Sequence, residues 1–183
     1  MITQARLHVP PRREDHGVGP DDSPLVLLEY GDYECPFCAQ ALSIVDSLRD
    51  LLGQSFRYVF RNFPLTESHP NALLAARAAE AAALQGRFWE MHHLLFLNQP
   101  LLRPDSLLGY AKSLRLDLDA FTRDLQGAPV QERIRQDLRG AMQAGVHGTP
   151  TFYINGRRYD GPVSERALLA DLEAARAEAS RSA

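Results

Sequence analysis

Cysteine is scarce in this chain of 183 residues, in which Cys35 and Cys38 are the only two. A secreted domain that depends on disulfides for its stability carries more cysteines and spreads them along the chain. A bridge between residues this close in sequence closes a very short loop and adds little chain-entropy stabilisation. The scarcity therefore excludes a disulfide scaffold and indicates that the pair is present for its chemistry.

Lysine and long apolar runs are also rare. Lys112 is the only lysine, the arginines are scattered and the formal net charge is −3, so we expect no nucleic-acid partner and no membrane insertion. No stretch approaches the roughly 20 apolar residues that a transmembrane helix needs. Residues 1–24 are polar and lack the apolar segment of a secretory signal. This favours a cytoplasmic location, or an extracytoplasmic one if a signal has been trimmed away.

The strongest local pattern is the near-continuous apolar run Leu25–Tyr30, which is typical of a strand covered on both faces. Gly31 ends this run. Pro36 suits the first turn of a helix, so Cys35 should lie at or beside the N-cap. The β-branched and aromatic run Phe56–Phe60 predicts a second core strand parallel to the first. Together these segments make a βαβ unit.

The rest of the chain predicts helices and then a hairpin. Between residues 64 and 144, start and stop signals indicate five helices, at 71–85, 88–97, 105–114, 118–125 and 129–144. Strand signals then return on both sides of a two-residue turn, and a last helix follows, at 151–154, 157–159 and 166–178.

This order of elements predicts an α/β chain with a thioredoxin fold (βαβ…ββα) and an inserted helical subdomain. The two halves of the fold are assigned to 24–63 and 145–178, and the insertion to 64–144. Residues 1–23 are an N-terminal extension with a candidate edge strand at 2–9. The turn-rich polar segment 10–24 is assigned to a loop or linker. Residues 179–183 are expected to fray.

Cys35 and Cys38 form a Cys-x-x-Cys pair at the start of the first expected helix. A thiolate at Cys35 would face free backbone N–H groups and the positive end of the helix dipole, which lower its pKa. We predict that Cys35 is a partly exposed nucleophile and that Cys38, one turn into the helix, resolves the mixed disulfide. The alternative is half of a zinc site. Zinc needs four ligands, and no histidine has a tight spacing to Cys35 among the available His69, His92, His93 and His147.

Glu29 stands six residues before Cys35 inside the apolar run, so its carboxylate is expected to be buried. Burial without a partner raises the pKa of a carboxyl and makes Glu29 a candidate proton acceptor near Cys38. The alternative is a carboxylate at a strand edge in contact with water.

Pro150 directly precedes an expected strand, in the run Gly148-Thr149-Pro150-Thr151. By sequence alone a cis bond before this proline is a minority outcome. His147 lies three residues earlier, in the loop that the fold places against the Cys35 end of the helix. An imidazolium there would favour the thiolate. The alternative is a histidine that points into water.

Several separate motifs resemble one family. They are Asp-Tyr-Glu-Cys-Pro-Phe-Cys, Gly-Thr-Pro-Thr-Phe-Tyr-Ile-Asn-Gly, Phe-Arg-Asn-Phe-Pro-Leu, Asp-His-Gly-Val-Gly-Pro and Gly-Arg-Phe-Trp-Glu-Met-His, spread over residues 15–172. The chain is similar to DsbA-type thioredoxin-fold oxidoreductases. More narrowly, it resembles a bacterial branch whose members occur as free proteins and as C-terminal tails of sodium/proton antiporters.

The resemblance implies a role for each matching residue. Cys35 matches the attacking cysteine, Cys38 the resolving one, and Glu29 the buried acidic position. Pro150 matches the cis-proline that packs against the disulfide, and Thr149 the residue whose backbone pairs with a bound peptide.

Two features depart from the family's pattern, the absent signal and Pro-Phe between the cysteines, where the family's strongest periplasmic oxidant carries Pro-His. We assign Phe37, together with Thr149 and His147, to substrate binding.

We therefore predict a thiol–disulfide oxidoreductase that exchanges a Cys35–Cys38 disulfide with protein or peptide substrates through a mixed disulfide on Cys35. No metal or organic cofactor is implied, and the redox partner is thioredoxin-linked, glutathione-linked or membrane-linked. The Pro-Phe pair resembles the glutaredoxin pattern, so a glutathione-coupled cytoplasmic reductant is one alternative. A redox-sensing interaction domain without turnover is the other.

Overall fold

The computed structural model describes residues 6–182 and has one sheet at its centre. The five strands are ordered β1-β3-β2-β4-β5. The bounds are β1 His16–Val18, β2 Leu25–Gly31, β3 Phe56–Asn62, β4 Thr151–Ile154 and β5 Arg157–Tyr159. Strand β2 pairs in parallel with β3 and antiparallel with β4, so the strand that leads to Cys35 lies in the middle of the sheet. This architecture confirms the predicted α/β thioredoxin fold.

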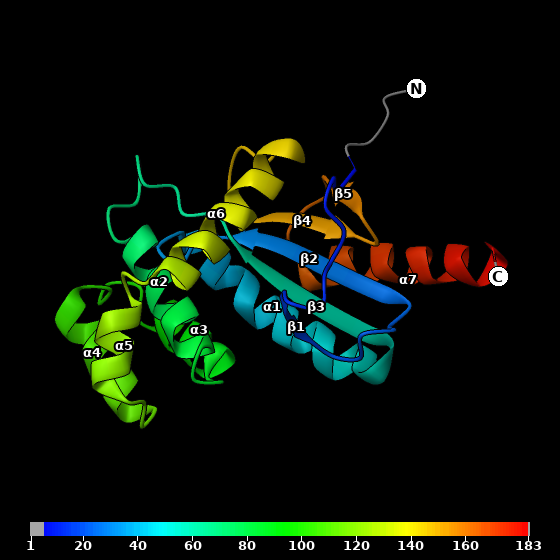
Figure 1. The fold of residues 1–183 in the computed structure, drawn as a ribbon. Helices are drawn as coiled ribbons and strands as arrows, with labels where there is room; N and C mark the ends of the chain where they lie inside the picture. Colours follow the sequence, from blue (N-terminus) through cyan, green and yellow to red (C-terminus); the bar gives the residue numbers. More distant parts are fainter. Residues whose placement is uncertain (1–5, 183) are drawn as a thin grey trace.

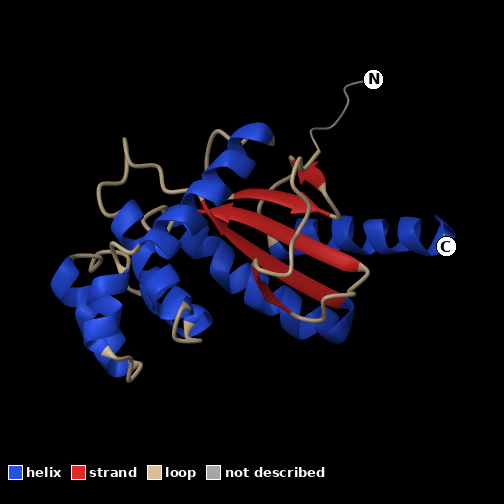
Figure 2. Cartoon of the chain, viewed as in Figure 1, coloured by secondary structure: helices blue, strands red, loops and turns tan. Residues whose placement is uncertain are grey.

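Helices cover both faces of the sheet (Figures 1 and 2). Their bounds are α1 Pro36–Leu52, α2 Ala72–Ala83, α3 Phe88–Leu97, α4 Pro104–Ser113, α5 Leu118–Asp124, α6 Ala128–Gln143 and α7 Glu165–Ser182, with a short 3-10 turn η1 at Gly53–Ser55. One apolar cluster joins Leu25 and Leu27 of β2 to α1 and α7. A second joins Leu28 and Tyr30 to the end of α6. Helices α2–α5 gather at one end of the sheet.

The alternation of side chains along β2 decides what faces Cys35. Leu25 and Leu27 pack on the side of α1, whereas Leu28 and Tyr30 pack on the side of α6. Because successive side chains of a strand point to opposite faces, Glu29 shares the face of Leu25 and Leu27. Its carboxylate is therefore buried under the helix that begins next to Cys35.

Three terminal features differ from the expectation. Residues 10–24, assigned to a loop, contain β1, which pairs antiparallel with β3. A strand of three residues with a central glycine is too short to show the alternation of apolar and polar side chains from which strands are predicted. The candidate edge strand at 2–9 lies partly outside the described residues, and Arg6 forms only an isolated bridge with Arg157. Helix α7 continues to Ser182, so residues 179–182 are helical.

A buried network of charges ties the N-terminal segment to β3 and α6. The carboxylate of Asp15 accepts hydrogen bonds from Arg61 (2.7 Å) and Arg133 (2.9 Å) and from the N–H of Arg12 (2.8 Å). Burial acts to raise the pKa of Asp15, but the hydrogen bond and charge of Arg61 outweigh it and hold this pKa below its usual range. Asp15 is thus an anion that Arg61 and Arg133 share, and Arg133 also pairs with Asp137 (3.1 Å).

We predict that Asp15→Asn lowers the free energy of unfolding by about 3–5 kcal/mol at pH 7, because it leaves the buried Arg61 guanidinium without its charge partner. A carboxyl with a lowered pKa stabilises the fold above its unfolded pKa. The deficit of the variant should therefore persist down to about pH 4 and shrink only below it. Denaturant unfolding checks this, with the exposed Asp22→Asn as the control. Equal losses in the two variants would contradict the network.

Candidate active site

Cys35 occupies the N-cap of α1, as the sequence predicts, and Pro36 follows it as the first helical residue. Its N–H donates to the carbonyl of Asp32 (3.1 Å), which closes the turn between β2 and α1. The side chain of Gln99 donates to the carbonyls of Tyr33 (2.9 Å) and Cys35 (2.8 Å). The backbone around Cys35 is thus fixed by the turn that follows β2 and by Gln99, which lies just after α3.

The surroundings of Cys35 favour its ionised form. The Cys38 thiol donates a hydrogen bond to its sulfur, backbone N–H groups of the first helical turn add to this effect, and together they lower the pKa of Cys35 to about 5 against the effect of burial. In the structure the Cys35 thiol also contacts the carbonyl oxygen of Thr149 (3.3 Å). Cys35 is 3% exposed, less than the partial exposure expected, because its sulfur turns toward the Thr149–Pro150 loop.

Cys38 and Glu29 lie beneath Cys35 and have the opposite character. Burial raises the pKa of the Cys38 thiol well above its ordinary value, and the charges of Cys35 and Glu29 add to this. Burial likewise raises the pKa of Glu29 to about 7, although hydrogen bonds from Tyr58 and Cys38 oppose the shift. Tyr58 donates to Oε2 of Glu29 at 2.7 Å. A group that titrates near neutrality therefore lies next to the inner thiol.

The Thr149–Pro150 peptide bond is cis, at the point where the loop enters β4. The loop presents the Thr149 carbonyl to the Cys35 sulfur. The hydroxyl of Thr151 donates to the carbonyl of Gly148 (2.7 Å), which holds the loop in this shape.

Phe37 and His147, which the sequence analysis assigns to substrate binding, are both exposed. Phe37 is two residues beyond Cys35 on α1, with 62% of its surface exposed. His147 makes no hydrogen bond, ion pair or ring contact among the described residues, so its proposed effect on the Cys35 thiolate stays a prediction. The histidine whose charge is coupled to Cys35 is His69.

Sequence reasoning missed the contacts that anchor the segment before Cys35. The carboxylate of Asp32 accepts from Leu65 N–H (2.8 Å) and lies 2.8 Å from Nδ1 of His69. Glu34 accepts from the backbone and the side chain of Asn71 (2.6 and 2.9 Å). The sequence does show two acidic residues flanking Tyr33 beside a reactive cysteine. It contains no motif that identifies their hydrogen-bond partners, which lie some 35 residues later in the chain.

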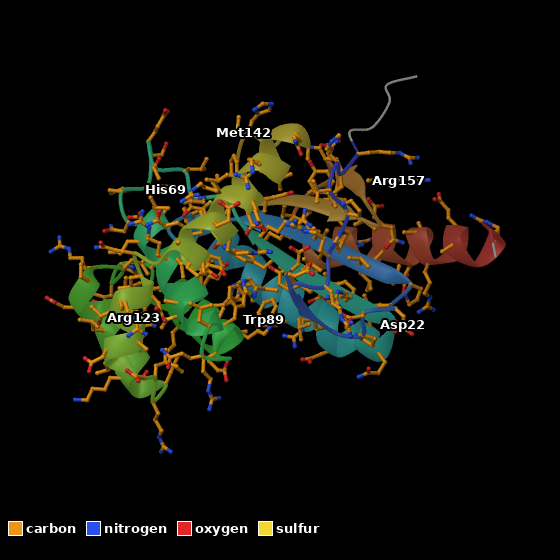
Figure 3. All side chains as sticks on the ribbon, viewed as in Figure 1. Asp22, His69, Trp89, Arg123, Met142 and Arg157 are labelled. Atoms are coloured by element: carbon orange, nitrogen blue, oxygen red, sulfur yellow. The ribbon has the colours of Figure 1, made fainter. Side chains whose placement is uncertain are left out.

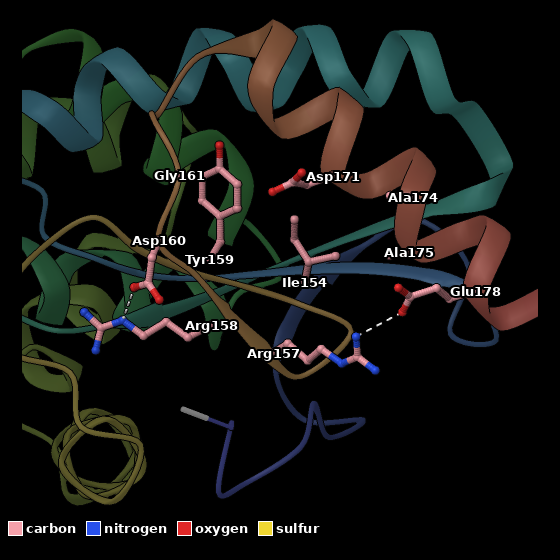
Figure 4. A pocket seen from close by; sticks show the side chains of 10 residues that line it. All are labelled: Ile154, Arg157, Arg158, Tyr159, Asp160, Gly161, Asp171, Ala174, Ala175 and Glu178. Carbon is pink, nitrogen blue, oxygen red and sulfur yellow. Dashed lines mark hydrogen bonds and ion pairs between the residues drawn. The ribbon is translucent and has the colours of Figure 1, made fainter. Parts of the chain in front are cut away.

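A groove elsewhere in the molecule contains none of these residues (Figure 4). It lies between α7 and the β4–β5 hairpin, and ion pairs Arg157–Glu178 and Arg158–Asp160 flank it. In residues 6–182 no three His, Cys, Asp or Glu side chains converge in a metal-binding arrangement. None of the helices described is long and apolar enough to cross a bilayer.

Comparison with known families and sequences gives two kinds of match. A family model described as Thioredoxin matches residues 12–174. The Na(+)/H(+) antiporter NhaA 3 of Salinispora tropica is 50% identical over 180 residues, which are 97% of this chain and 27% of the relative. NhaA 1 of Mycobacterium sp. (strain KMS) is 44% identical over 170 residues, 92% of this chain and 28% of the relative. The chain spans about a quarter of the length of these relatives.

Solved structures with the same fold cover almost the whole chain. A thioredoxin-like oxidoreductase from Silicibacter pomeroyi DSS-3 has 28% identity and a TM-score of 0.81, with 90% of this chain and 94% of that chain covered. BdbD from Bacillus subtilis, in its oxidised form, has 24% identity and a TM-score of 0.80, with 88% and 92% covered. Alpha-DsbA1 of Wolbachia pipientis has 19% identity and a TM-score of 0.80, with 92% and 94% covered.

We predict that alkylation of the reduced protein modifies Cys35 first and that its rate is half-maximal at a pH of about 5, because the thiolate is the reacting form. Cys38 should stay unmodified at neutral pH, since its pKa is raised and its side chain is buried. Mass spectrometry after timed labelling with iodoacetamide measures both sites, with the unfolded protein as the control. Equal rates at the two cysteines near pH 7 would refute this assignment.

We predict that Glu29→Gln makes the reduced protein more stable at pH 8, by about 3 kcal/mol. Burial raises the folded pKa of Glu29 to about 7. The folded state therefore keeps a proton that the unfolded chain releases above pH 4–5, and stability falls as the pH rises through this window. The gain should vanish near pH 5. Denaturant unfolding at both pH values tests this, with the exposed Glu67→Gln as the control, and a gain independent of pH would contradict it.

Proposed function

Because the chain belongs to the thioredoxin family, we propose that it is a thiol–disulfide oxidoreductase that exchanges a Cys35–Cys38 disulfide with protein or peptide substrates. The observation that carries the proposal is the contrast between the two sulfurs. Hydrogen bonds from Cys38 and the helix terminus lower the pKa of Cys35 to about 5, whereas burial raises that of Cys38. A stable thiolate beside a protonated thiol suits an attacking and a resolving cysteine.

The relatives support this assignment and its scope. The structural neighbours include DsbA-type proteins, as the sequence resemblance implies, and the neighbour with 28% identity is described as an oxidoreductase. The curated relatives are antiporters of which this domain is about a quarter. We propose for this chain the redox activity of the domain and not ion transport.

The first step of the proposed reaction is attack on Cys35. A substrate thiolate attacks the Cys35 sulfur of the disulfide, a mixed disulfide forms and the Cys38 sulfur leaves with the electron pair. Because the pKa of Cys38 is raised by burial, this sulfur requires a proton at once. Glu29, with a pKa of about 7, is the group next to Cys38 that gives this proton and takes it back in the reverse direction.

The second step releases Cys35 as a thiolate. A second substrate thiolate attacks the substrate sulfur of the mixed disulfide, so the substrate leaves oxidised and the protein has gained two electrons. A thiol with a low pKa is the better leaving group, and the low pKa of Cys35 also stabilises the reduced protein. The pair therefore favours accepting electrons.

Two features beside Cys35 suit a peptide substrate. Phe37 offers an exposed apolar surface next to the nucleophile. The carbonyl of Thr149, the residue before cis-Pro150, contacts the Cys35 sulfur, and an extended peptide that lies along this loop would have its sulfur near Cys35. We propose that these residues hold the substrate while the mixed disulfide exists.

We predict that Cys35→Ser abolishes insulin reduction and peptide oxidation, because no sulfur remains at the attacking position. Cys38→Ser should also lose turnover but should accumulate a mixed disulfide with the substrate on Cys35, since the resolving thiol is gone. Non-reducing electrophoresis and mass spectrometry measure both results. The two variants are matched controls for each other. If the wild-type cysteines form and lose a disulfide but catalyse no turnover, the protein is a redox sensor. If the Cys35→Ser variant instead accumulates substrate adducts on Cys38, the attacking and resolving roles of the two cysteines are reversed.

A further inference from the structure

Negative charge accumulates just before Cys35. Asp32 and Glu34 lie three residues and one residue before it, and the side chain of Asp32 is 0% exposed. Ionisation of Cys35 adds a third negative charge within four residues of chain. Like charges raise each other's pKa, so these carboxylates oppose the thiolate unless a positive charge lies close to them.

His69 is the only side chain able to carry a positive charge among the described contacts of Asp32 and Glu34. Its Nδ1 lies 2.8 Å from Oδ2 of Asp32, and the side chain is 21% exposed. It stands on the loop before α2 (Figure 3). Because a carboxylate can only accept, Nδ1 carries a hydrogen in this contact. Nε2 is then the nitrogen that gains or loses the titrating proton.

We propose that His69, held by Asp32, is a positioning residue whose positive charge favours the Cys35 thiolate and makes the disulfide a stronger electron acceptor. The inference deepens the proposed thiol–disulfide exchange and rests on it. His69 lies just before α2, within the segment 64–144 assigned to the inserted helical subdomain. This subdomain would therefore contribute a charge to the site.

The charges around His69 agree with this role. Burial acts to lower the pKa of His69, but the hydrogen bond and charge of Asp32, with the charges of Cys35 and Glu34, raise it overall. The charges that raise the pKa of His69 thus come from acidic groups of the segment 32–35. A coupling of charges is reciprocal, so a thiolate that favours the protonated imidazole is itself favoured by it.

The effect on the redox equilibrium follows from the balance of charge. In exchange with glutathione, two glutathione molecules are oxidised to their disulfide, and the Cys35–Cys38 disulfide accepts the two electrons. The products are the Cys35 thiolate and the Cys38 thiol, with one proton on Cys38 and one released to solvent. Only this reduced form carries a charge on Cys35, so the positive charge of His69 stabilises the reduced side alone.

The decisive variant is His69→Asn, whose amide N–H can still donate to Asp32 but carries no charge. We expect the pKa of Cys35, measured by thiolate absorbance, to rise by about one unit. We expect the glutathione equilibrium at pH 7 to shift toward the protein disulfide by about tenfold. The matched control is His8→Asn, which makes the same change at an exposed histidine outside the site and should change neither quantity. An unchanged Cys35 pKa in a folded His69→Asn protein overturns the proposal.

A measurement on the wild-type chain keeps the inference testable if the variant fails to fold. The imidazole of His69, titrated by NMR, should have a higher pKa in the reduced protein than in the oxidised protein, by a shift similar to that expected for Cys35. Equal pKa values in the two redox states would show that His69 serves only to hold Asp32.

The two proposals fail in different ways, because the titrations need no protein substrate. If the wild-type protein shows no cysteine-dependent turnover while the Cys35 pKa still responds to His69→Asn, the proposed enzyme activity is wrong and the coupling is real. If turnover depends on Cys35 and His69→Asn leaves the thiolate and the glutathione equilibrium unchanged, only the role of His69 is refuted.

Discussion

One buried carboxylate, that of Asp32, fixes the segment that carries the reactive sulfur. It accepts hydrogen bonds from the N–H of Glu34 and of Leu65 and from the ring of His69, each at 2.8 Å. Hydrogen bonds to an ionised acceptor are stronger than neutral ones, and the loss of this acceptor would leave donors unpaired in a buried place. Asp32 directly follows β2, the middle strand, so the Cys35 sulfur is held by the most constrained part of the sheet.

The chemistry of the site follows from the unequal number of hydrogen bonds that two neighbouring buried sulfurs receive. Cys35 lies at a helix N-terminus and receives hydrogen bonds, whereas Cys38, one turn later, lies in the apolar interior with Glu29. The same helix thus favours charge on its first sulfur and disfavours it on the second. The hydrogen-bond donors to Glu29 are Tyr58 and Cys38, and both are neutral, so neither compensates the negative charge as a cation would. This explains why burial governs the Glu29 pKa.

The sequence predicted the parts of the fold and of the site that depend on local order. The apolar run of β2, the proline after Cys35 and the glycine-containing turn after Ile154 are local signals, and the structure has the corresponding strand, helix start and hairpin. The burial of Glu29 could be predicted because an apolar strand surrounds it. The contacts of His69 and Gln99 with the Cys35 segment could not, because they join residues far apart in sequence and depend on tertiary packing. His147 is close to Pro150 in sequence, and its proposed effect on the Cys35 thiolate stays a prediction.

The end of β3 links the charge network to the site. Arg61 and Asn62 are consecutive, so their side chains point to opposite faces of the sheet. Arg61 binds Asp15 and the Tyr30 hydroxyl, whereas Asn62 donates from its side chain to Glu80 of α2 and from its backbone N–H to Asp137 of α6. The chain then runs directly into the loop whose Leu65 N–H binds Asp32. Both ends of this loop are therefore fixed, one by buried charges and one by Asp32. A histidine on a loop held in this way can keep a constant distance from a thiolate, which a charge effect requires because Coulomb energy depends on separation.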